Sequence, residues 1–425
     1  MSREMRHSGI EWIGEIPKEW KVSSVRWIMV NKSIRNQPNA EVLSLYRDWG
    51  IVPKSSRDDN HNVTSEDTSN YKVVQKGDFV INKMKAWQGS MAVSEYDGII
   101  SPAYYVCSFI DKNICKRYIH HLLRNESYKT EYMRLSSGLR VGQWDLNIEN
   151  FLRIPIVLPS LSEQQKIADY LDKVCGEVDE MIALQEQMIE ELKAYKQSVI
   201  TEAVTKGLNP NAPMKDSGID WIGDVPEHWK LGRLKRISNK IGDGLHGTPE
   251  FVDNSCYYFI NGNNLGRKQI EIYGDTNKVD KAEFDKYYIE LDENTILISL
   301  NGTIGNLSFY NGEMVILGKS AGYVRLKSQS NKHYYYYYLQ ALNVKEYFYL
   351  SLAGTTIGNL SLGTLRNTPI TIPPISEQQS IASYLDTKCV EIDALIAIKQ
   401  AKIEELKDYK KSVIYEYVTG KKEVN

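Results

Sequence analysis

A long segment that occurs twice in the sequence constrains the fold more than any other feature. Residues 162–206 align without gaps with residues 376–420 at an offset of 214, and 27 of the 45 positions are identical. The first copy contains no proline, and from Ile167 to Val199 its apolar residues recur at alternating steps of four and three. This spacing is typical of the seam of a left-handed coiled coil. Packing along the seam stabilises a helix of this length, so each copy needs a partner.

The predicted seam residues are those that follow the four–three spacing. They are Ile167, Leu171, Val174, Val178, Met181, Met188, Leu192, Tyr195 and Val199 in the first copy, and Ile381, Leu385, Ile392, Leu395, Ile396, Ile403, Leu406 and Val413 in the second. Three lysines, Lys388, Lys399 and Lys402, interrupt the second stripe. At the start of the first helix, Ser162 and Gln165 fit a capping box. We expect an intramolecular antiparallel coiled coil of two helices, each ~65 Å long.

A shorter repeat precedes each of the two globular segments. Ser8–Trp20 and Ser217–Trp229 match at eight of thirteen positions, at an offset of 209. The chain is therefore two copies of one unit, each with an aromatic lead-in, a globular segment and a long helix. The predicted divisions are a first domain, a first long helix, a second domain, a second long helix and a short tail, at residues 1–158, 159–206, 207–372, 373–420 and 421–425.

The globular segments show the signals of a mixed α/β fold. Short apolar runs such as Asp78–Asn82 and Thr295–Leu300, bounded by glycine-containing turns, predict strands. One helix is predicted at Tyr118–Leu135 and another at Tyr334–Tyr349. The tyrosine run 334–338 has two interpretations, a helix that covers the sheet and a surface on which bases stack. We favour the helix that covers the sheet. The fold class is α/β (α+β): two mixed α/β domains joined by two long helices in a pseudo-twofold repeat.

The composition predicts a cytoplasmic protein. No run of eighteen apolar residues predicts a membrane span, and the first twelve residues lack the apolar core of a secretion signal. The five cysteines include no CxxC pair, which favours free thiols in a reducing compartment. The net charge is −2, but residues 1–158 carry +4 and residues 159–206 carry −5. A polyanion such as DNA would therefore meet the globular segments before the first helix.

No catalytic constellation is present in the sequence. A phosphate-binding Walker loop, an HExxH zinc motif and a GxSxG nucleophile motif are all missing. The chain also lacks the NPP[YF] tetrapeptide of adenine methyltransferases. We therefore expect a non-catalytic chain that binds neither metal nor cofactor itself.

Polar and basic loops are the best candidates for binding. Arg and Lys suit phosphates and guanine edges, Asn and Gln suit adenine, and glycines let the backbone approach a phosphate. The candidate DNA-binding residues are Lys83, Lys85, Trp87, Gln88, Arg140 and Gln143 in the first domain, and His246, Asn263, Asn264, Arg267, Lys268 and Asn301 in the second. Together they suggest that two separated patches of DNA are read.

These features resemble the specificity subunit of type I restriction–modification enzymes. The matching pieces are Trp12–Pro17 with Trp20, their copy at Trp221–Pro226 with Trp229, and the two helix starts. The helix starts share a proline, a Glu-Gln pair and an isoleucine: Pro159, Glu163, Gln164 and Ile167, then Pro373, Glu377, Gln378 and Ile381. The order of variable domain and similar helix, repeated twice, covers essentially the whole chain.

The resemblance implies a function and a set of partners. Each variable domain would recognise one half of a two-part sequence in double-stranded DNA. The helices would set the spacing and bind methyltransferase subunits, expected to be two, and motor–nuclease subunits would join for cleavage. S-adenosylmethionine, ATP and Mg²⁺ would belong to those partners. In this family the Glu-Gln helix starts (Glu163, Gln164, Glu377, Gln378) and the seam residues form the coiled coil and the subunit interface.

Two other interpretations remain open at this stage. One is a specificity subunit that serves a type II-like enzyme with fused methyltransferase and nuclease. The other is a coiled-coil scaffold whose end domains bind proteins and not DNA. Salt-dependent affinity for DNA would distinguish the type I specificity subunit from such a scaffold.

Overall fold

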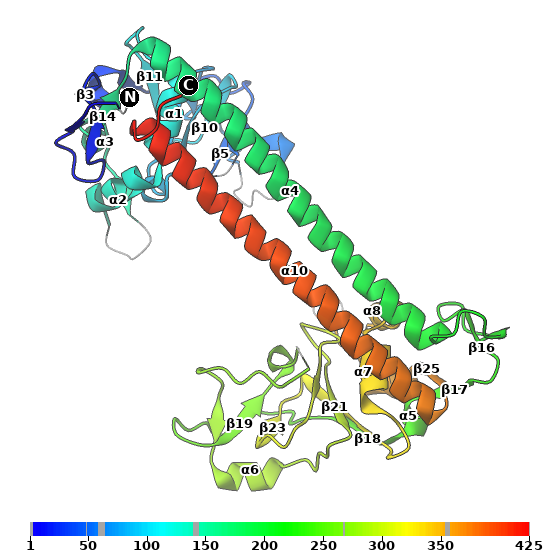
Figure 1. Ribbon diagram of the computed structural model, residues 1–425. Coiled ribbons are helices and arrows are strands. Elements are labelled where there is room, and N and C mark those ends of the chain that lie inside the picture. Colours follow the sequence, from blue (N-terminus) through cyan, green and yellow to red (C-terminus); the bar gives the residue numbers. More distant parts are fainter. Residues whose placement is uncertain are drawn as a thin grey trace. The chain divides into compact units, whose positions relative to one another are not determined.

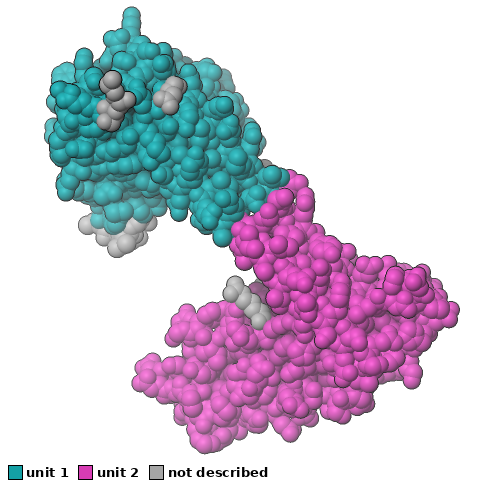
Figure 2. All heavy atoms as spheres, viewed as in Figure 1, with its two compact units in different colours: residues 1–186, 401–425 teal, residues 187–400 magenta. Residues whose placement is uncertain are grey.

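The chain folds into two compact units, each of which contains one globular domain and part of both long helices. A computed structural model describes residues 3–47, 49–57, 64–138, 144–266, 268–352 and 358–424. Unit 1 comprises residues 1–186 and 401–425, and unit 2 comprises residues 187–400 (Figure 2). The division falls within the two long helices, so each unit has its own segment of the helix pair.

Unit 1 follows the predicted mixed α/β plan. Its strands are β1 Met5–His7, β2 Glu15–Pro17, β3 Lys21–Ser24, β4 Met29–Lys32, β5 Leu43–Tyr46, β6 Gly50–Pro53, β7 Lys72–Val74, β8 Phe79–Asn82, β9 Met91–Val93, β10 Gly98–Ile100, β11 Tyr104–Phe109, β12 Ser136–Ser137, β13 Asp145–Leu146 and β14 Pro155–Leu158. Its helices are α1 Lys116–Arg124, α2 Glu126–Leu135, α3 Ile148–Leu152 and the first part of α4 Leu161–Lys206.

Unit 2 has a series of elements that is similar to that of unit 1. Its strands are β15 Met214–Asp216, β16 Asp224–Pro226, β17 Lys230–Arg233, β18 Ser238–Asp243, β19 Tyr257–Ile260, β20 Lys278–Val279, β21 Thr295–Ser299, β22 Leu307–Phe309, β23 Val315–Leu317, β24 Ala321–Leu326 and β25 Pro369–Ile372. Its helices are α5 Leu234–Ile237, α6 Lys281–Tyr287, α7 Lys332–Gln340, α8 Leu342–Leu350, α9 Leu362–Asn367 and the first part of α10 Ile375–Val418.

The repeat extends into the globular domains, where the two sequences differ. The main sheet of unit 1 has the strand order β4-β11-β8-β9, and that of unit 2 has the order β18-β24-β21-β22, antiparallel throughout. In each sheet the second strand is the long strand that precedes the helical pair, and the last two strands form a hairpin. This arrangement confirms the fold class. Figure 1 shows the long helices α4 and α10 with the strands and shorter helices of each unit.

Each of the two helices predicted in the globular domains is in fact a pair. The first breaks at Asn125, whose side chain accepts the amide of Ser127 and so caps α2. The second breaks at Ala341, between α7 and α8. A capping asparagine satisfies the free amides at a helix start, which explains the new helix at position 125. The tyrosine run on α7 is buried at all five positions, as predicted for a helix that covers the sheet.

Both long helices exist and run antiparallel within each unit. In unit 1, Lys410 on α10 contacts Asp179 on α4 (2.6 Å), and in unit 2, Lys196 on α4 contacts Asp393 on α10 (2.7 Å). These two ion pairs are equivalent in the repeat. Asp179 corresponds to Asp393 and Lys196 to Lys410, each at the offset of 214. The predicted cap of α4 is wrong: the helix begins at Leu161, and the hydroxyl of Ser160, not of Ser162, accepts a hydrogen bond from the amide of Glu163.

The predicted seam residues are mostly correct in α10 and partly correct in α4. The predicted residues Ile167, Leu171, Val178, Ile381, Leu385, Ile392 and Val413 are buried, and Leu192 and Leu406 are half-buried. The other half of the heptad is displaced by one residue in α4. In α4, Cys175, Ile182 and Ile189 face the seam in place of Val174, Met181 and Met188. In α10, Ile396 and Ile403 lie in the seam as predicted and Cys389 joins them, whereas Leu395 is 47% exposed.

The displaced register explains the lysines that interrupted the predicted second stripe. Lys388 and Lys402 lie beside the seam, where they pair with Glu391 and Glu405 on their own helix. Lys399 alone occupies a half-buried seam position. Met181 and Tyr195, which were predicted to lie in the seam, are about half exposed.

A buried tyrosine ties the globular domain to the helix ends in each unit. The hydroxyl of Tyr118 on α1 lies 3.0 Å from the carbonyl of Val157 and 3.1 Å from that of Val418 at the end of α10. The hydroxyl of Tyr334 on α7 donates to the carbonyl of Val204 at the end of α4 (3.0 Å). Burial holds the pKa of both tyrosines well above the usual value, so both hydroxyls stay protonated and can donate.

Removing either hydroxyl should destabilise its unit. We expect Tyr118→Phe and Tyr334→Phe each to lower the free energy of unfolding by about 1–2 kcal/mol, because each variant loses a buried hydrogen bond. Urea denaturation followed by tryptophan fluorescence measures the change. Tyr349→Phe is the matched control, since Tyr349 is 59% exposed. Equal stability of all three variants would contradict the assignment.

Candidate nucleic-acid interface

The first candidate surface is the loop between β8 and β9 in unit 1. Lys83 is half-exposed and lies 3.8 Å from Asp145, and Lys85 is exposed with no ion partner among the residues that the structure describes. Trp87 is half-buried; its indole nitrogen donates to the carbonyl of Met84. The left-handed backbone of Gly89 (φ 79°) ends the short helical turn that carries Trp87.

Two further segments join this loop. The ring of Trp144 packs edge-on against Trp87 at 5.2 Å, and the amide of Leu146 donates to the carbonyl of Lys83 (3.0 Å). Gln88 accepts a hydrogen bond from Arg47 in the turn after β5 (2.6 Å). The structure therefore places the predicted residues Lys83, Lys85, Trp87 and Gln88 in one neighbourhood. Arg140 and Gln143 lie outside the described residues.

Arg47 is a cation of this neighbourhood that sequence reasoning missed. It stands alone between a strand and a turn, without the cluster of lysines and amides that marked the other loop. Its exposed guanidinium lies beside Gln88 because the β5–β6 hairpin packs near the β8–β9 hairpin. Local sequence could not show this contact, because the two residues are 41 positions apart.

In unit 2 the candidate loops meet around residues 317–320. The amide of Leu245 donates to the carbonyl of Leu317, and the amide of Gly262 donates to the hydroxyl of Ser320. The loop after β21 joins them, because the amide of Leu300 donates to the carbonyl of Ser320. Lys319 lies in this joining segment, is exposed, and has no ion partner in the described part of the chain.

The predicted residues of unit 2 differ in how accessible they are. His246 is exposed and pairs with Asp243 (2.7 Å), and Asn263 is exposed. Asn264 is buried and is used inside the chain: it accepts the amide of Asn261 and donates to the carbonyl of Glu271. The prediction that Asn264 reads a base is therefore wrong, because its side chain is buried and hydrogen-bonded within the turn. Arg267 lies outside the described residues.

Lys268 and Asn301 take different roles. The ammonium of Lys268 bonds Asp386 on α10 and the hydroxyl of Tyr337 on α7, so Lys268 ties the domain to the long helix. Burial raises the pKa of Asp386, but the bonds from Lys268 and Tyr337 outweigh it, and the pKa lies below its usual value. Asn301 follows β21, and its side-chain oxygen is buried without a hydrogen-bond partner within the described residues.

The β8–β9 and β21–β22 loops are equivalent in the two sheets. Both connect the third strand of the sheet to the fourth. One carries lysines, a tryptophan and a glutamine, and the other carries Asn301 with Gly302 and Thr303. Equivalent positions with different hydrogen-bonding groups can read different bases.

The Glu-Gln pair at each helix start binds within the chain. Trp20 donates its indole N–H to Glu163 (3.2 Å), and Trp229 donates to Glu377 (2.9 Å). Gln164 is buried; it accepts the amide of Cys115 and donates to the carbonyl of Pro159. Gln378 repeats both bonds with Asn331 and Pro373.

The structure shows two further properties of the described residues. They contain no group of three or more His, Cys, Asp or Glu side chains that could hold a metal ion. None of their helices combines the length and the apolar character that crossing a bilayer requires.

Comparison with known proteins defines the class. The family model described as "Type I restriction modification DNA specificity domain" matches the chain twice, at residues 17–194 and 226–408. The chain therefore belongs to this family. It is a type I specificity subunit with two DNA target-recognition domains, in agreement with the resemblance seen in the sequence.

One curated relative matches nearly the whole chain, and another matches about two thirds of it. A putative type I restriction enzyme specificity subunit, MjaX, of Methanocaldococcus jannaschii is 25% identical over 438 residues, which cover 96% of this chain and 95% of the relative. The StySPI specificity subunit of Salmonella potsdam is 27% identical and covers 65% of this chain and 59% of its own length.

Solved structures share the fold. A chain from a study of complex assembly and conformational transition of the type I R-M system has a TM-score of 0.68 at 16% identity, and covers 95% of this chain and 98% of its own. The HsdS subunit of Thermoanaerobacter tengcongensis has a TM-score of 0.51 at 17% identity, with the same coverage. At these identities the likeness concerns the fold alone.

Loss of one loop lysine should weaken DNA binding in a salt-dependent way. We expect Lys85→Ala and Lys319→Ala each to reduce the slope of log affinity against log salt concentration by about 0.9, the value for one phosphate contact. A titration of labelled duplex at several salt concentrations measures the slope. Lys402→Ala, on the long helix, is the control. An unchanged slope in both loop variants would remove these lysines from the interface.

Proposed function

We propose that this chain recognises an asymmetric, two-part DNA sequence and directs methylation and restriction at that sequence by partner subunits. The observation that carries the proposal is the contrast between equivalent sheets and different loops. The two sheets share one strand order, whereas the loops at equivalent positions present lysines in one unit and an asparagine in the other. Two domains with one plan and different reading groups suit two different half-sites.

Partner binding is supported by the outer face of the long helices. In unit 1 the apolar side chains of Met181, Leu184 and Tyr409 are about half exposed. Their counterparts at an offset of 214 are Leu395, Ile398 and Tyr195 in unit 2, and these are exposed to a similar extent. Large apolar side chains that are exposed close together can mark an interaction site. Their recurrence at equivalent positions of the two helices supports the binding of two copies of one modification subunit.

The remaining partners follow from the same proposal. Restriction subunits would join for cleavage, and S-adenosylmethionine, ATP and Mg²⁺ would be bound by the partners and not by this chain. The charge of −5 on residues 159–206 favours a protein over DNA as the partner of the first helix. Since the target is the cell's DNA and incoming DNA, we place the complex in the cytoplasm.

One alternative differs only in the partner. A specificity subunit that serves a fused methyltransferase–nuclease would read DNA with the same two domains. Identification of the proteins that co-purify with the chain separates the two cases, because the fused enzyme is a single large polypeptide.

The central test is the pattern of adenine methylation in the genome with the gene intact and deleted. We expect deletion to abolish methylation at one two-part, asymmetric motif, because no other chain would position the modification subunit there. Single-molecule sequencing of native DNA reads every methylated adenine. Complementation with the intact gene is the control. Unchanged methylation, in a strain whose modification subunit is shown to be made and active, would contradict the proposal.

A second test addresses the spacing between the half-sites. Deletion of Ala183–Ile189 and Ala397–Ile403 removes one heptad from each helix at equivalent positions and keeps the seam in phase. Each helix becomes about 10 Å shorter, so we expect a spacer shorter by about three base pairs with unchanged half-sites. The methylated motif of the variant reports both. An unchanged spacer would show that the helices do not set it.

A further inference from the structure

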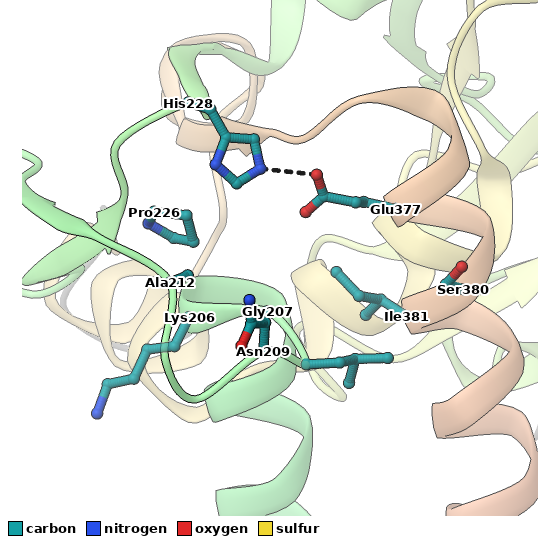
Figure 3. Close-up of a pocket in the computed structure, with 10 residues that line it drawn as sticks. Lys206, Gly207, Asn209, Ala212, Pro226, His228, Glu377, Ser380 and Ile381 are labelled. Carbon is teal, nitrogen blue, oxygen red and sulfur yellow. Dashed lines mark hydrogen bonds and ion pairs between the residues drawn. The ribbon is translucent and has the colours of Figure 1, made fainter.

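A cavity in unit 2 lies at a place that an arginine fills in unit 1. The cavity has a volume of about 220 Å³ and is bordered by the end of α4, the lead-in before β16 and the start of α10 (Figure 3). Glu377 and His228 are hydrogen-bonded to each other at its edge, and Ile381 forms part of its apolar wall. Every one of these residues has a counterpart in unit 1, so the two sites can be compared position by position.

In unit 1 the corresponding carboxylate belongs to Glu163. Arg3 binds it with both guanidinium nitrogens, at 2.6 and 3.2 Å, and its guanidinium also lies over the ring of Trp20 at 5.6 Å. The side chain of Arg3 is only 20% exposed. A bidentate arginine–carboxylate pair is among the strongest charge-assisted hydrogen-bond arrangements in proteins.

In unit 2 the counterpart of Arg3 is Ala212. The correspondence is fixed by the neighbouring bonds: Arg6 donates to the carbonyl of Trp20, and Lys215, at the same offset of 209, donates to the carbonyl of Trp229. The alanine leaves the space of a long side chain unfilled. A second difference enlarges it, because Ser380 stands where the first helix has Lys166.

Glu377 retains capacity for a guanidinium. Its carboxylate accepts one bond from Trp229 (2.9 Å) and one from His228 (2.6 Å). A carboxylate has about four acceptor positions, so two remain, which is the number that one guanidinium uses. The carboxylate is also more accessible than its counterpart, with 39% of the Glu377 side chain exposed against 26% for Glu163.

We propose that this cavity accepts an arginine side chain of the modification subunit, in the place that Arg3 occupies in unit 1. The inference rests on the proposed function, since it names a contact of the same assembly. The apolar wall suits the aliphatic part of an arginine, and Glu377 with Trp229 forms the same carboxylate–indole pair that holds Arg3. Unit 1 provides this arginine itself, so the contact distinguishes the two docking sites for the modification subunit.

The test fills the cavity from within the chain. In Ala212→Arg the introduced guanidinium should bind Glu377 as Arg3 binds Glu163. We expect the melting temperature of the free chain to rise and the affinity for the purified modification subunit to fall ~10-fold at one of its sites, because the acceptor is already occupied. Asn211→Arg is the matched control, since it adds the same charge next to the cavity at a residue that does not line it.

A second variant removes the acceptor without filling the space. Glu377→Gln keeps an oxygen for the indole but loses the negative charge, so we expect weaker binding of the modification subunit without a gain in melting temperature. Titration calorimetry measures both affinities. If both variants bind the modification subunit as tightly as the wild type does, the proposed arginine contact is wrong while the proposed function stands. If the wild type does not bind the modification subunit, the proposed function itself fails.

Discussion

A hydrogen bond from a buried indole to a glutamate at the start of each long helix fixes the position of the elements around it. Trp20 and Trp229 are each 1% exposed, and each finds its acceptor in the first turn of a helix, at Glu163 or Glu377. A buried indole N–H without an acceptor would cost roughly 1–3 kcal/mol. The bond therefore fixes the aromatic lead-in to the helix. The glutamine that follows each glutamate binds the segment before α1 or α7, which orients the globular domain on the same helix start.

The far end of the other helix completes each core. Val418 at the end of α10 lies in the core of unit 1 and Val204 at the end of α4 lies in that of unit 2, each with its carbonyl facing a buried tyrosine. A unit thus needs the start of one helix and the end of the other. This requirement excludes a fold in which each half of the duplicated sequence closes on its own helix alone.

Charge on the helix pair specifies its direction. In the antiparallel pair, Lys196 faces Asp393 and Lys410 faces Asp179. A parallel pair in register would bring equivalent positions together, so that Lys196 would face Lys410 and Asp179 would face Asp393. Like charges at a partly buried seam are destabilising, and opposite charges at the same place are not. The duplication itself provides this discrimination, since the aspartate and the lysine of the ion pair each occur in both copies.

The sequence was sufficient for the architecture and insufficient for the details that depend on contacts between distant segments. The gapless repeat and its apolar spacing predicted two antiparallel helices, because such patterns follow from helix geometry alone. They did not decide between Val174 and Cys175 as seam residues, since both are apolar and adjacent, and only the facing helix selects one. In the same way the spacing of amides and lysines indicated the β8–β9 loop as a candidate. It could not indicate Arg47 or Lys319, because hydrogen bonds between segments distant in the sequence bring the segments of these two residues to the candidate surfaces. Asn264 shows the converse: a polar residue in a promising loop is used to build the turn.

The distribution of identity between the two halves separates stability from recognition. The residues that hold each unit together recur in both copies: the tryptophan, the Glu-Gln pair and the tyrosine under the helix end. The loops at the third and fourth strands do not recur, and exposed residues there, such as Lys85, contribute little to the core. Exposed substitutions of this kind usually change stability by less than about 0.5 kcal/mol. Loop sequence in one half can therefore change, and with it the DNA that the half reads, while the anchors and the other half stay as they are. An asymmetric target is the natural outcome of a symmetric frame whose two reading surfaces vary independently.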